Sequence, residues 1–344
     1  MAKGDRNMGW PGFFRAFTVL CAIVLLLAQR YLDLTAPGSG ARQALSVCEG
    51  LTLWTVPALF MLWGMFSLED GKQQVSASLL GLALPAFCSL AVWGAVYAVA
   101  SHLLEGGAFT LEGVWEALVH AARGDTYYHL WVLYPLIGLY LVHPVLHRFT
   151  SSASRGELRY LLGLCFLFAS LLPLWTALHP YGAVSIWREQ LQVQMVLGWV
   201  GCYVGGWYLR HFEISRAAEL ILYILGIAGL VLSVTDPFDA LTLRQYTSLN
   251  VVLTAAAFCV LFRYVLGVSE ERSRRRAVNS IGSRAFGVYL IHQLWLLVFQ
   301  RLGISPLHFP AALSIPLFAV VLFALSLPFA WLISLIPGVG LKLT

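Results

Sequence analysis

Ten long apolar runs occupy most of this chain of 344 residues. A helix of about 20 residues crosses the ~30 Å hydrocarbon core of a bilayer, and each run is close to that length. None of the runs alternates polar and apolar residues, as the strands of a membrane β-barrel would. The sequence therefore predicts an all-α, polytopic membrane protein, a single domain over 1–344, with spans near 13–29, 51–67, 79–101, 127–147, 158–178, 191–209, 219–235, 247–266, 285–301 and 311–335.

The composition excludes the soluble classes of protein. Hydrophobic residues make up 59% of the chain and charged residues 11%, compared with about 45–50% and about 25% in soluble proteins. So few charges cannot cover the surface of a soluble fold of this size, and disordered and nucleic-acid-binding classes are excluded with it. The six cysteines are scattered and form no CxxC pair, which argues against a disulfide framework or a zinc ribbon.

The positions of lysine and arginine orient the predicted spans. With the N-terminus in the cytoplasm, sixteen of the 22 basic residues fall on the cytoplasmic side, and the outer side holds Arg30, Arg42, Arg123, Arg188, Arg244 and Arg301. Because cytoplasmic loops carry the excess of basic residues, this distribution predicts that both termini lie in the cytoplasm.

Three local patterns concern packing and metals. Pro57 predicts a bend in the second span. Gly201 and Gly205 form a GxxxG pattern, which predicts close packing of two helices. His143 and His147 share a helix face at the spacing of zinc ligands, but no third ligand is near in sequence. We interpret them as interfacial histidines and expect no metal.

Ionisable side chains inside a membrane are costly, so each one is a functional candidate. Arg15 opens the first span, His129 begins the fourth and His292 lies well inside the ninth. A histidine there can accept or donate a proton near neutral pH, although a packed structural histidine fits the same positions. An imidazole facing lipid would lose its hydrogen bonds. We therefore predict that both rings face a polar, partly hydrated cavity bordered by the first, fourth and ninth spans.

The segments around these histidines carry a family likeness. They are Tyr127–Pro144 (YYHLWVLYPLIGLYLVHP), Val56–Met61, Gly205–Leu209, Gly287–His292 and Leu332–Pro337. Together they keep the order and spacing of the bacterial membrane acyltransferase-three family, which the chain resembles over nearly its whole length. Members of that family acylate sugars of surface polysaccharides and related lipids. The resemblance implies about ten spans in the bacterial inner membrane, with both termini inside.

Two positions depart from the family pattern. The family's first span carries an arginine and, after ten intervening residues, a histidine taken to be the catalytic base. Here Arg15 matches the arginine, while Leu26 stands at the histidine position. In the second span, Trp63-Gly64 replaces the family's serine-glycine, and Leu51–Val56 lacks its arginine.

The resemblance implies transfer of an acyl group, most often acetyl, from a cytoplasmic acyl-CoA such as acetyl-CoA to a glycan hydroxyl. Because Leu26 cannot accept a proton, the remaining candidates for the catalytic acid and base are His129 and His292. Tyr128 and Tyr289 are candidate hydroxyl donors for the oxyanion. No serine lies in a nucleophile elbow, which favours direct transfer.

Binding roles and partners follow from the same resemblance. Arg15 is a candidate for binding a CoA phosphate, although it can equally serve as a topology anchor. Trp131 and Tyr134 are candidate substrate-binding residues. The expected partners are a glycan or lipid-linked sugar and membrane lipid, with no nucleic acid and no permanently bound cofactor.

Two other classes of function stay open on the sequence. The absent histidine is compatible with a catalytically inactive relative that binds a glycan or lipid, or supports a partner enzyme. A glycolipid transporter is the third class, but the chain has no internal repeat of the kind that many transporters show.

Overall fold

A computed structural model describes residues 9–69, 75–104, 110–123, 127–179, 197–236, 241–267 and 276–336. Within these ranges the regular secondary structure is helical and no strand occurs. Nine helical segments of the described chain are long and apolar enough to cross a membrane: Gly9–Leu32, Gly40–Ser67, Val75–Leu104, Tyr128–Ser152, Arg155–Ala177, Arg216–Thr235, Leu249–Leu266, Ser280–Arg301 and Ala311–Ser334. The predicted all-α, polytopic fold is confirmed, while the orientation of the termini stays a prediction.

The predicted span at 191–209 is described only in part. Helix α12 covers Val200–His211, and residues 180–196 lie outside the described part of the chain. The sequence therefore counts one more span than the described residues contain.

The chain forms two compact units. Unit 1 comprises Met1–Leu25, Ser46–Gly71 and Val145–Gly282, and unit 2 comprises Leu26–Leu45, Lys72–Pro144 and Ser283–Thr344. Each unit combines segments from both halves of the sequence, so neither is a contiguous domain. The single domain expected over 1–344 stays a prediction.

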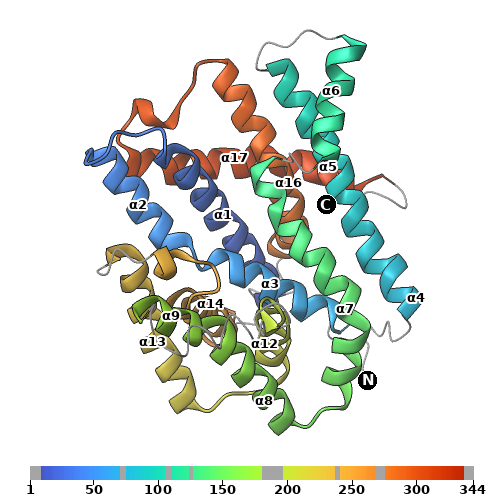
Figure 1. Cartoon of the computed structure of the whole chain (residues 1–344), viewed down its shortest axis with the longest axis vertical. Coiled ribbons are helices and arrows are strands. Elements are labelled where there is room, and N and C mark those ends of the chain that lie inside the picture. Colours follow the sequence, from blue (N-terminus) through green and yellow to red (C-terminus); the bar gives the residue numbers. More distant parts are fainter. Residues whose placement is uncertain are drawn as a thin grey trace. The chain divides into compact units, whose positions relative to one another are not determined.

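The main α-helices of the two units are labelled in Figure 1. They are α1 (Gly9–Leu32), α2 (Gly40–Thr52), α3 (Thr55–Ser67), α5 (Leu84–Leu104), α6 (Leu111–Ala122), α7 (Leu133–Ser152), α8 (Arg155–Phe166), α9 (Leu172–Leu178), α12 (Val200–His211), α13 (Arg216–Thr235), α14 (Leu249–Leu261), α16 (Arg276–Arg301) and α17 (Ala311–Ser334).

An aromatic cluster forms part of the core of unit 1. Trp54, between α2 and α3, stacks on Phe258 of α14 with ring centroids 4.1 Å apart. Phe14 of α1 stacks on Trp54 with ring centroids 6.3 Å apart, and its ring is tilted against that of Phe262 at 5.1 Å. Such large rings bury extensive apolar area, and the stacked geometry adds to it. The cluster joins three segments that are far apart in sequence.

The second span is interrupted just before Pro57. Helix α2 ends at Thr52 and α3 begins at Thr55, so Pro57 lies in the first turn of α3, where a missing N–H is tolerated. At the break, the Val56 N–H donates to the Leu53 carbonyl at 3.4 Å, and the Thr55 hydroxyl donates to the Thr52 carbonyl at 2.8 Å. These bonds satisfy backbone groups at the break, as a membrane environment requires.

Helices α3 and α12 pack through glycines at very close range. A Cβ on Gly206 would lie 2.0 Å from the Met61 carbonyl oxygen, and one on Gly64 would lie 1.7 Å from that of Tyr203. The predicted GxxxG pair makes a different contact, because Gly201 faces Cys165 of α8 and Gly205 has Leu162 of α8 at an ordinary 3.6 Å. Gly201 thus packs closely as predicted, but Gly205 does not, and its neighbour Gly206 makes the tighter approach.

We expect Gly206→Ala to lower the free energy of unfolding by about 1–3 kcal/mol, because the added methyl group overlaps backbone that cannot rotate away. The matched control is Gly205→Ala, whose methyl group fits beside Leu162 and improves helix propensity. Thermal unfolding of the purified protein in detergent measures both. Equal melting temperatures for the two variants would contradict the assignment of the close contact to Gly206.

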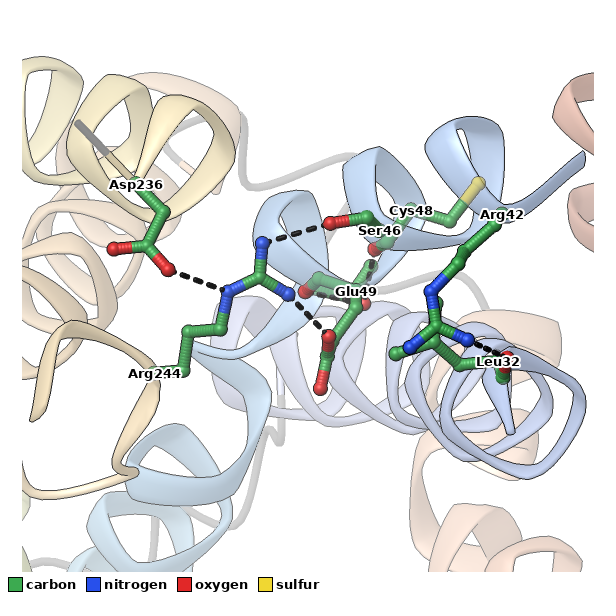
Figure 2. A network of polar contacts seen from close by, with 8 residues as sticks. Leu32, Arg42, Ser46, Cys48, Glu49, Asp236 and Arg244 are labelled. Atoms are coloured by element: carbon green, nitrogen blue, oxygen red, sulfur yellow. Dashed lines mark hydrogen bonds and ion pairs between the residues drawn. The ribbon is translucent and has the colours of Figure 1, made fainter. Parts of the chain in front are cut away.

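A polar network in unit 1 surrounds the guanidinium of Arg244 (Figure 2). Arg244 is the last residue of the short 3-10 helix Leu241–Arg244. Its Nη1 donates to Glu49 Oε2 at 2.6 Å, its Nη2 to Ser46 Oγ at 2.7 Å and its Nε to Asp236 Oδ2 at 3.1 Å. Asp236 ends α13 in the left-handed region, with φ 38°, which Asp adopts more readily than most residues. One cation therefore joins α2 to the end of α13.

Unit 1 also contains an apolar cavity of about 300 Å³ between α8, α12, α13 and α14. Its wall includes Cys165, Cys202 and the α12 glycines Gly201 and Gly205. Small side chains leave this space because they fill less volume than the apolar residues around them. None of the site residues predicted from the sequence is among the described residues that line it.

In unit 2, α16 packs against α17 through aromatic pairs. The ring centroids of Trp295 and Phe329 are 5.3 Å apart, and those of Phe299 and Phe318 are 5.2 Å apart. Trp295 and Phe299 are four residues apart in α16, so the two pairs lie on one face of that helix. Helix α5 packs against α6 in the same unit. The two aromatic pairs fix α16 against α17.

Candidate active site

Unit 2 brings the two predicted histidines together. His129 lies in a short 3-10 helix, Tyr128–Val132, and His292 lies in α16. Their ring centroids are 5.3 Å apart, and neither side chain has any exposed surface. A pair of imidazoles buried among protein atoms is costly unless polar contacts compensate, so the contacts of each ring indicate its role.

The 3-10 helix determines where the His129 backbone points. The Leu130 N–H donates to the Tyr127 carbonyl at 2.9 Å, which tightens the chain ahead of α7. Such short 3-10 segments are frequent at the starts of α-helices. The carbonyl of His129 accepts the hydroxyl of Tyr289 at 2.8 Å. This hydrogen bond connects the 3-10 helix to α16.

The ring of His129 has one engaged nitrogen and one available nitrogen. Its Nε2 lies 3.4 Å from the Leu290 carbonyl oxygen, and a carbonyl can only accept, so this contact assigns the ring proton to Nε2. The lone pair is then on Nδ1. No described residue forms a hydrogen bond with Nδ1, although the atom is buried. His129 therefore presents an unshared lone pair, which is what a general base requires.

His292 has the opposite arrangement. Its Nδ1 lies 2.6 Å from the Tyr289 carbonyl oxygen, which assigns the proton to Nδ1 and the lone pair to Nε2. The side-chain amide nitrogen of Gln293 lies 2.9 Å from that Nε2 and 2.6 Å from the Tyr128 hydroxyl. The two amide hydrogens satisfy both contacts, so the lone pair of His292 is already occupied.

Tyr97 of α5 completes the wall around His129. Its hydroxyl donates to the Leu290 carbonyl at 2.5 Å, and its ring meets that of His129 edge-on with centroids 4.8 Å apart. Tyr127 stacks on Tyr97 at 4.8 Å. These contacts pack the His129 ring against α5 and α16.

The remaining predicted residues are divided between the units. Tyr128 and Tyr289 lie beside the imidazoles, as described. Trp131 is half-buried and Tyr134 is 46% exposed, and substrate binding by these two rings stays a prediction. Arg15 belongs to unit 1, where its guanidinium carbon lies 4.0 Å from the centre of the Phe66 ring. Binding of a CoA phosphate by Arg15 also stays a prediction.

A family model described as an acyltransferase domain matches residues 8–335, nearly the whole chain. The chain belongs to the acyltransferase-three family. No curated protein and no solved structure matches the sequence significantly. The match supports a membrane acyltransferase, in agreement with the apolar helices described above.

In this acyltransferase, Leu26 is a core residue with 4% of its surface exposed. It lies in the part of α1 that belongs to unit 2. A leucine there supplies neither a base nor a hydrogen bond. The proton transfer that the family pattern assigns to this position must therefore come from another side chain if the acyltransferase is active.

Sequence reasoning missed Tyr97 and Gln293. It also missed the pair Arg30 and Gln300, whose side chains hydrogen-bond at 3.2 Å, with the Arg30 guanidinium over the Tyr128 ring. Gln293 and Gln300 carry no charge, and Arg30 was counted only as an outer topology charge. The available signal was helical spacing, because Tyr289, Gln293 and Gln300 follow one another at four and seven residues and share a face of α16. That spacing marks a polar stripe on an otherwise apolar helix.

Proposed function

We propose that this acyltransferase moves an acyl group, most often acetyl, from cytoplasmic acyl-CoA to a hydroxyl of a surface or lipid-linked glycan in the bacterial inner membrane. We assign the role of general base to His129. The observation that supports this choice is its Nδ1, a buried nitrogen with a lone pair that no described residue engages.

The proposed reaction needs no covalent intermediate on the protein. His129 Nδ1 takes the proton of the acceptor hydroxyl while the hydroxyl oxygen attacks the thioester carbonyl, and a C–O bond forms. The tetrahedral oxyanion then collapses, the C–S bond breaks, and the leaving thiolate takes the proton back from His129. A base positioned in this way contributes about 10²–10⁴ in rate.

The contacts suggest different roles for the two tyrosines. Tyr128 accepts from Gln293, so its own hydroxyl proton is available for the oxyanion. Tyr289 already donates to the His129 carbonyl, so we assign it a positioning role. His292 is a positioning residue as well, because its two ring nitrogens are both engaged.

Leu26 favours a second candidate function, that of a catalytically inactive relative that binds a glycan or lipid.

The experiment that tests the acyltransferase function is mass spectrometry of surface glycans. We expect it to find an acyl group on the glycans of the producing strain and to find that group lost after deletion of the gene. Complementation with the wild-type gene should restore it. If the wild type acylates no glycan tested while Leu26→His does, the inactive-relative function is the correct one.

A further inference from the structure

Arg30, at the end of α1, has the features of an anion-binding residue. We propose that it binds an acid group of the acceptor, a carboxylate or a phosphate, beside the two histidines. The acceptor would then be an acidic sugar or a sugar phosphate. This inference rests on the proposed function for the identity of the ligand, but its binding test does not depend on acyl transfer.

The guanidinium of Arg30 has few partners. Its Nη2 donates to Gln300 Oε1 at 3.2 Å, and its central carbon lies 5.6 Å from the ring centre of Tyr128 and 5.9 Å from that of Tyr127. Its Nε is buried with no hydrogen-bond partner among the described residues. Because a guanidinium carries five N–H donors, most of its hydrogen-bonding capacity is available to a ligand.

Three other arginines of the described chain, Arg210, Arg216 and Arg244, form ion pairs with carboxylates. Arg244 contacts Glu49 and Asp236, and Arg210 contacts Glu69 at 2.9 Å. No acidic side chain in the described ranges forms an ion pair with Arg30. The faces of two aromatic rings offset part of the cost of a poorly hydrated cation, but they leave its hydrogen bonds unmade. An oxyacid anion supplies both the opposite charge and two acceptors in the geometry of the guanidinium fork.

A chain of contacts connects Arg30 to the imidazoles within unit 2. Its guanidinium lies over Tyr128, whose hydroxyl accepts from Gln293, and Gln293 contacts His292. The Oε1 of Gln293 and the Nδ1 of His129 are both buried and lack partners among the described residues. These two atoms are a second indication of a ligand, because buried polar groups normally have hydrogen-bond partners.

The position of Arg30 on α1 supports the same assignment. Arg30 lies four residues after Leu26, so the two side chains share one helix face. The charge distribution predicts that this end of α1 is the outer one, where a glycan acceptor would arrive. The first span thus supplies a cation one turn beyond the position where the family carries its histidine.

The test measures ligand binding to the full-length protein in detergent, without an acyl donor. The probes are methyl glucuronide, its neutral counterpart methyl glucoside, and glycerol phosphate, titrated by calorimetry. We expect the wild type to bind at least one anionic probe about tenfold tighter than the neutral sugar. Arg30→Gln should abolish this preference and Arg30→Lys should retain part of it, since an ammonium keeps the charge but not the fork.

The matched control is Arg301→Gln, because Arg301 is an exposed arginine at the end of α16. It should leave the preference unchanged. A preference for the glucuronide identifies a sugar carboxylate, and a preference for glycerol phosphate identifies a phosphate. The inference is overturned if the wild type binds all three probes equally, or if Arg30→Gln or Arg30→Lys, with a wild-type melting temperature, keeps the full preference. Anion preference without acyl transfer would instead count against the proposed function alone.

Discussion

Alanine at position 129 is expected to lower the rate of glycan acylation by about 10²–10⁴, because the other imidazole of the described site, His292, has both ring nitrogens engaged. The His129 side chain is completely buried, so expression and the melting temperature must be measured alongside activity. His129→Gln is the second variant, since an amide keeps hydrogen bonding but cannot act as a base. Mass spectrometry of surface glycans, or of an acceptor incubated with acyl-CoA, measures the rate.

His292→Ala is also expected to abolish acylation, through a different cause. Removal of this ring leaves an amide hydrogen of Gln293 without its acceptor and frees Tyr128 to shift. The matched control is His308→Ala, an exposed histidine in the short 3-10 helix Pro306–His308. Wild-type activity in both His129→Ala and His292→Ala would show that the site is wrongly assigned.

Arg244→Met is expected to lower the free energy of unfolding by about 3–5 kcal/mol, the usual cost of removing one partner from a buried ion pair. The side chains of Arg244, Glu49 and Asp236 are only 22%, 11% and 13% exposed. The substitution leaves two carboxylates poorly hydrated and without their shared cation. Unfolding in detergent, followed by circular dichroism, measures the loss.

Two further variants separate charge from packing at this network. Arg244→Lys keeps the positive charge but cannot bond Ser46, Glu49 and Asp236 together, so an intermediate stability is expected. Adding Glu49→Gln and Asp236→Asn to Arg244→Met removes the uncompensated charges and should recover part of the lost stability. If this triple variant is no more stable than Arg244→Met, lost packing and not charge is responsible.

The sequence predicted the main features of the fold because hydropathy is a local property. A run of about 20 apolar residues defines a spanning helix whatever lies beside it, and the described helices follow those runs. The same locality accounts for the error at Gly205. The GxxxG pattern shows that a close contact exists on α12, but the rotation of the helix against α3 decides that Gly206 approaches Met61.

The candidate residues His129 and His292 were found for a similar reason. Ionisable groups are rare in apolar helices, so each is conspicuous in the sequence. Gln293 and Tyr97 were not found, since uncharged polar and aromatic residues are common at span ends and their contacts are not encoded nearby.

The sequence alone determined the helical class, the family and the presence of two imidazoles in apolar helical segments, because each depends on residue type and short-range spacing. Only the tertiary structure decided which imidazole has an available lone pair. His129 Nε2 meets a carbonyl 161 residues away, and Gln293 reaches a hydroxyl 165 residues away. These partners depend on the relative register of α5, α16 and the turn before α7. That register is set by side-chain packing between helices, which no local pattern contains.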